Sequence, residues 1–106
     1  MATGNILAEG NTDRLKLITI TWDPASVTGT NTTSEQDVTV PGVKTGDFVF
    51  VNKPSLNAGV GIVNCRVKSA DTVSVTWVNA TGSAVNPGSE SYTFLVLRPD
   101  ATLTAF

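Results

Sequence analysis

The chain has 106 residues, a formal net charge of −2 at pH 7, and charged side chains at only 15% of its positions. This length predicts a single domain. The lack of a basic excess argues against nucleic acid as a partner. The hydrophobic content of 41% excludes a disordered chain.

Membrane insertion and export are not expected. No apolar run approaches the roughly 18 residues of a membrane helix. The first residues lack the basic and apolar regions of a signal peptide, so no export signal is expected there. The only cysteine, Cys65, leaves no partner for an internal disulfide.

The first segment, residues 1–13, is polar and rich in glycine, with Ile6 and Leu7 as its one apolar pair. We expect an extended N-terminal arm that is ordered by lying on a neighbouring chain. Residues 14–22 then alternate, with Ile18, Ile20 and Trp22 on one face, which predicts a strand that ends at Asp23-Pro24.

A hairpin is the most regular stretch of the chain. Residues 59–78 predict two strands joined by a short turn at 68–71. The first strand is expected to direct Val63, Cys65 and Val67 inward. The inward positions predicted for the second strand are Val73, Val75 and Trp77.

Two further strands are apolar on both faces. In residues 48–52, Phe48 and Phe50 alternate with valines, and in residues 90–98, Leu95 and Leu97 alternate with Tyr92, Phe94 and Val96. Such strands are covered on both sides or lie at an interface. Another alternating strand is expected over residues 35–40.

Turn signals recur at roughly ten-residue spacing, which is typical of all-β domains. We therefore predict a single-domain β-sandwich or jelly roll of about 6–8 antiparallel strands. The expected division is an arm over 1–13, the sandwich over 14–99 and a tail over 100–106. The tail carries Leu103 and Phe106, apolar groups that would need cover.

The residues offer little for catalysis. With one cysteine and no histidine, the common zinc sites and the nucleophile–base pairs lack their members. Two alternatives use carboxylates: a glycosidase pair, or calcium at Glu35 and Asp37. Trp22, Trp77 and Tyr92 could pack in the core or form a sugar-stacking platform. We expect no enzyme, no cofactor and no metal.

Three stretches resemble a family of small virion proteins of tailed bacteriophages, of the head decoration (cement) type. They are ITITWDPASV (18–27), TVPGVKTGDFVFVNKP (39–54) and AGVGIVNCRVKSADTVSVTWVNAT (58–81). The likeness covers residues 18 to about 98 and consists of strand and turn signatures. The chain departs from the commonest pattern at Asn64-Cys65 and in its N-terminal arm.

The resemblance implies a knob on the outer surface of the capsid that clamps neighbouring major capsid proteins and associates with itself as a dimer or trimer. The alternative is a tail or fibre module, or a carbohydrate-binding module for host attachment. The apolar positions expected at a partner interface are Ile6, Leu7, Phe48, Phe50, Leu95, Leu97, Leu103 and Phe106.

Overall fold

The computed structural model describes residues 12–29 and 32–99, and within them every regular element is a strand. The strands are β1 (Thr12–Trp22), β2 (Thr32–Thr39), β3 (Phe48–Asn52), β4 (Val60–Ser69), β5 (Thr72–Asn79) and β6 (Glu90–Pro99). The all-β prediction is confirmed for this part of the chain. No helix in these two ranges could cross a membrane.

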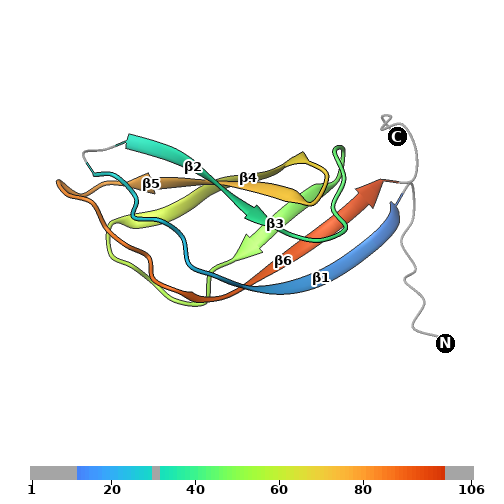
Figure 1. The fold of residues 1–106 in the computed structure, drawn as a ribbon, viewed down its shortest axis with the longest axis horizontal. Coiled ribbons are helices and arrows are strands. Elements are labelled where there is room, and N and C mark those ends of the chain that lie inside the picture. Colours follow the sequence, from blue (N-terminus) through green and yellow to red (C-terminus); the bar gives the residue numbers. More distant parts are fainter. Residues whose placement is uncertain (1–11, 30–31, 100–106) are drawn as a thin grey trace.

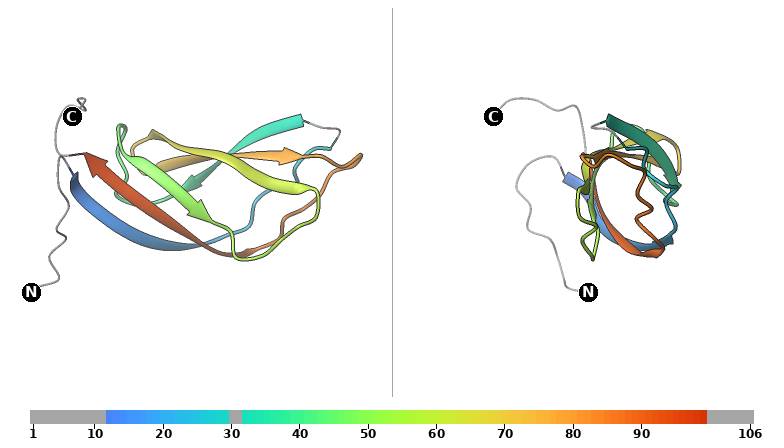
Figure 2. Two further views of the ribbon diagram at one scale, coloured as in Figure 1. Left: turned by 180° about the vertical axis from the view of Figure 1, so that it is seen from behind. Right: turned by 90° about the vertical axis from the view of Figure 1, so that its left-hand side faces the viewer.

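The strands form two antiparallel three-stranded sheets, ordered β1-β6-β3 and β2-β5-β4 (Figure 1). Their inner faces meet in one core. Trp77 of β5 and Tyr92 and Phe94 of β6 are fully buried there. The alternation of β5 predicted this for Trp77, whereas β6 was predicted only to be apolar on both faces. Viewed end-on in Figure 2, the two sheets curve around this interior.

A continuous ribbon of paired chain links the two sheets. β1 pairs with β6, and β2 pairs with β5. Between them, Val27 and Val85 exchange backbone hydrogen bonds of 2.8 and 3.0 Å. The buried Asn79 side chain donates to the carbonyls of Val27 and Ser83 at 2.9 and 3.0 Å, which satisfies backbone groups where the ribbon leaves the sheets.

The β4–β5 hairpin turns at Ala70 and Asp71, within the predicted connection. Asp71 has φ of 63°, a left-handed conformation that aspartate tolerates better than most residues. Its backbone and carboxylate bind the β2–β3 connection: Oδ1 accepts from Gly42 N at 2.7 Å, and its N–H donates to the Val43 carbonyl at 2.9 Å. The turn therefore ties the hairpin to the segment that leads into β3.

The predicted inward position of Val63 is wrong. The pairing of β4 with β5 shifts between Ile62 and Asn64, so one extra residue enters β4 and the alternation changes phase. Ile62 packs against the core, and Val63 is 58% exposed. Cys65 and Val67 remain inward and pack on the core. Other differences are small: β1 begins at Thr12 inside the expected arm, and β2 begins at Thr32.

Candidate functional site

The outer side of the β1-β6-β3 sheet carries a block of six apolar side chains, which we call the apolar face. Strand pairing arranges them in two rows across the sheet. The rows are Leu15-Leu97-Phe48 and Leu17-Leu95-Phe50.

The apolar face is open to solvent. Leu17 is 68% exposed and Phe50 is 59% exposed, while Leu15 and Phe48 are 42% and 47% exposed. The two β6 leucines lie between them and are half-buried. A contiguous patch of this kind is unusual on a protein that meets only water and is typical of interaction sites, which makes the apolar face the candidate site.

Four of the eight positions expected at an interface meet on this face: Phe48, Phe50, Leu95 and Leu97. Ile6, Leu7, Leu103 and Phe106 lie outside the described residues. Sequence reasoning missed Leu15 and Leu17, although the signal was present. Both leucines alternate with the inward-facing Ile18 and Ile20, so period two places them on the outer face.

Ion pairs hold both ends of β3 to β6. The Asp47 side chain, 2% exposed, accepts from Arg98 Nε and Nη2 at 2.9 Å each, and Arg98 Nη2 also donates to the Gly42 carbonyl at 2.8 Å. These Arg98 hydrogen bonds hold the pKa of Asp47 below its usual value, against the opposing effect of burial. At the other end, Lys53 Nζ lies 2.7 Å from Glu90 Oε2.

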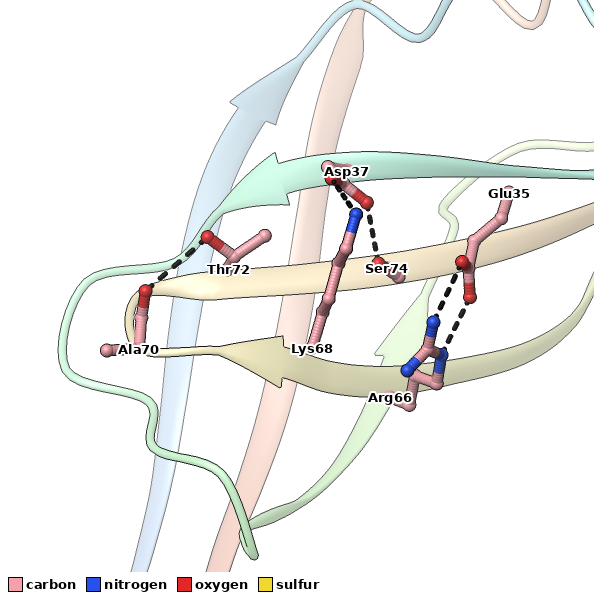
Figure 3. Close-up of polar contacts among 7 residues, drawn as sticks. All are labelled: Glu35, Asp37, Arg66, Lys68, Ala70, Thr72 and Ser74. Carbon is pink, nitrogen blue, oxygen red and sulfur yellow. Dashed lines mark hydrogen bonds and ion pairs between the residues drawn. The ribbon is translucent and has the colours of Figure 1, made fainter.

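The outer face of the β2-β5-β4 sheet is polar, and we call it the charged face (Figure 3). Arg66 donates to both carboxylate oxygens of Glu35 at 2.8 and 3.0 Å. Asp37 accepts from Lys68 at 3.0 Å and from Ser74 at 2.6 Å. The Arg66 bonds lower the pKa of Glu35, and the Ser74 bond is the largest cause of the lowered pKa of Asp37.

The aromatic groups considered for sugar stacking lie in the core cluster. The Trp22 ring centroid is 5.2 Å from that of Tyr92 and 6.0 Å from that of Trp77. Trp77 and Tyr92 are fully buried, and Trp22 packs against the core, so the core interpretation is confirmed. Burial, reinforced by the nearby Glu90 charge, raises the pKa of Tyr92 to about 12.

The other candidate groups have local partners. Glu35 and Asp37, considered for calcium, face Arg66 and Lys68 instead. Among the described residues, no group of three or more metal-ligating side chains comes together. Cys65 is half-buried, its Sγ donates to the Val49 carbonyl at 3.2 Å, and burial raises the pKa of its thiol.

A cleft of about 600 Å³ lies between β3 and β4, where the edges of the two sheets face each other. It is lined by residues of both strands, among them Val49, Val51, Ile62 and Cys65. Among the described strands, β3 has β6 as its neighbour on one side only, and the cleft lies on its other side. No family model, curated protein or solved structure matches the chain.

Proposed function

We propose that this protein is a structural component of a tailed-phage virion: a decoration protein that binds the outer surface of the head and stabilises contacts between major capsid proteins. The apolar face carries the proposal. It supplies what such a protein needs, namely apolar surface on rigid strands that the monomer itself does not bury. The resemblance over residues 18 to about 98 gives the partner class.

The energetics of the apolar face suit this role. Covering about 300 Å² of apolar surface would contribute roughly 7 kcal/mol at about 25 cal/mol per Å². The costs of association offset part of this gain. Because β1, β6 and β3 are already ordered by the core, little additional backbone ordering is needed. Repetition over a capsid lattice multiplies a modest single-site affinity by avidity.

We further propose that the fold is a shortened jelly roll. A jelly roll coils one long paired ribbon, so that its first strand lies beside its last and its second beside its next-to-last. The β1–β6 and β2–β5 pairs, continued through Val27 and Val85, match this pattern. Two further strands would complete eight, one pairing with β3 and the other with β4. An experimental structure with β1 beside β2 would contradict this assignment.

The carbohydrate-binding alternative is weaker. A sugar platform needs aromatic rings open to solvent, and Trp77 and Tyr92 are fully buried. Rebinding to stripped phage particles distinguishes a protein that acts on the head from one that acts on the tail or fibre.

The experiment is rebinding to phage particles stripped of this protein. Wild-type protein is expected to bind heads and to raise their resistance to heat or chelator. Leu17→Lys, at the β1 side of the apolar face and its most exposed member, is expected to weaken head binding at least tenfold. Leu56→Lys is the matched control, because Leu56 is 86% exposed but lies off this face, and it should bind like wild type.

Two outcomes would overturn the proposal. Wild-type protein that binds tails or fibres and leaves stripped heads bare would move the site of action away from the capsid. Equal head binding by the two lysine variants would remove the apolar face from the interface.

A further inference from the structure

The four edge strands of the two sheets differ in charge. Natural sheets keep their edges from pairing with other chains by placing charged side chains on them. Three of the edges here follow this rule, and β3, with the sequence FVFVN, carries no charged residue. The charges on the other three edges include Arg14 and Lys16 on β1, Glu35 and Asp37 on β2, and Arg66 and Lys68 on β4.

The charges that flank β3 do not protect its edge. Asp47 precedes the strand and is bound to Arg98, and Lys53 follows it and is bound to Glu90. Both partners belong to β6, on the opposite side of β3 from the free edge. β3 is therefore uncharged along its length, which is the composition that favours strand pairing between chains.

The backbone groups of this edge can be assigned. The Val49 carbonyl accepts from Cys65 of β4, so it points away from β6 and into the cleft. In an antiparallel ladder the N–H and C=O of one residue point to the same side, and the side alternates along the strand. Val49 and Val51 thus present their N–H and C=O groups to the cleft of about 600 Å³, on the side of β3 away from β6.

We propose that β3 pairs with β3 of a second copy of this chain, antiparallel, about a twofold axis at Phe50. In this register Val49 of each copy faces Val51 of the other. The Val49 and Val51 residues of the two copies then form four interchain hydrogen bonds, and in each copy the Val49 carbonyl exchanges its 3.2 Å bond from Cys65 Sγ for one of them. Phe50 faces its own copy at a pair without hydrogen bonds, where side chains lie closest.

The dimer would join two β1-β6-β3 sheets into one and would make the two apolar faces continuous. A five-residue strand pair is small beside the roughly 1,600 Å² of a typical stable interface. We therefore expect a weak dimer whose population rises with protein concentration. This inference goes beyond the proposed function and is tested on the isolated protein, so its failure leaves head binding untouched.

The first experiment is a disulfide trap. At a pair without hydrogen bonds the Cα atoms lie about 4.5 Å apart, within disulfide range. Phe50→Cys in a Cys65→Ser background should form a covalent dimer under mild oxidation at least tenfold faster than the control, Leu17→Cys in the same background. The control residue is similarly exposed but lies on β1. Equal rates would overturn the proposal.

The second experiment is sedimentation of the full chain over a range of concentrations. Wild type and Leu17→Lys are expected to dimerise alike, and Phe50→Lys is expected to stay monomeric because it places two like charges across the axis. Wild type that remains monomeric up to ~1 mM overturns the proposal. It is also overturned if both lysine variants are monomeric, since the outer face would then hold the dimer.

Discussion

The two outer faces of this small domain lie over similar sheets but carry different kinds of side chain. Each covers a three-stranded antiparallel sheet over a shared core. On the charged face, ion pairs of 2.8 and 3.0 Å pass over the small side chains of the central strand β5. On the apolar face, the central strand β6 carries two leucines between the exposed side chains of β1 and β3.

The difference shows which face is suited to water. Paired charges and hydroxyl groups keep their hydration and prevent association, whereas exposed leucine and phenylalanine gain free energy when another surface covers them. The same contrast holds at the edges, where β4 is charged and β3 is not. The face and the edge of one sheet therefore both favour contact with another chain.

Both outer faces lie over one core, so we expect the two sheets to unfold together. Trp77→Ala removes a β5 side chain that packs against Trp22 and Tyr92 of the opposite sheet. We expect it to lower the free energy of unfolding by about 3–5 kcal/mol. Urea titration followed by circular dichroism measures this loss. Trp77→Phe should lose less, and a loss below about 1 kcal/mol for the alanine variant would contradict a shared core.

The next contrast is between a buried ion pair and an exposed one. Asp47→Asn should lower the free energy of unfolding by about 2 kcal/mol, because Arg98 then loses a charged hydrogen-bond partner at a buried site. Asp37→Asn on the charged face is the control and should have a clearly smaller effect, since Asp37 remains open to solvent.

The pH dependence follows from the lowered pKa of Asp47. The unfolded chain takes up a proton at this carboxyl nearer the ordinary value of about 3.9, at higher pH than the folded chain does. Its contribution to stability is therefore complete above that value and is lost as the pH falls through the lowered folded pKa. Acid titration should show a shallower loss of stability for Asp47→Asn than for wild type. Identical acid curves would contradict this assignment.

Local pattern predicted much of this architecture. Alternation placed β3 at residues 48–52, as observed, and it identified both β3 and β6 as strands with two apolar faces. The inward position of Trp77 followed from the same period, and the core was the favoured place for Tyr92. These features depend on neighbours along the chain, which is why sequence alone was sufficient.

Features that depend on distant residues could not be predicted. The bulge that turns Val63 outward arises from its register with β5. The ion pair of Asp47 with Arg98 joins residues 51 positions apart. The alignment of Leu15 and Leu17 with the β6 leucines depends on which strands pair. Four of six members of the apolar face were therefore identified, but their arrangement as one surface needed the structure.

A sharper test concerns the apolar face itself. Because Leu17 is 68% exposed, Leu17→Lys should change the free energy of unfolding by less than about 0.5 kcal/mol. The same variant should reduce the fluorescence of a dye that binds apolar surface. A stability loss above about 1.5 kcal/mol would mean that the isolated chain already covers this face, and the contrast with the charged face would then fail.

The smallest effect is expected on the charged face. Glu35→Gln removes an exposed pair with Arg66, so the melting temperature should change by no more than about 2 °C at low salt, and by less at high salt where charges are screened. Arg66 lowers the pKa of Glu35, so this small contribution is present above the unfolded pKa near 4.3 and disappears as the pH falls. A double-mutant cycle with Arg66→Gln isolates the pair. A large coupling that persists in high salt would show that this face, like the opposite one, carries structure or binding that exposed charges in water do not explain.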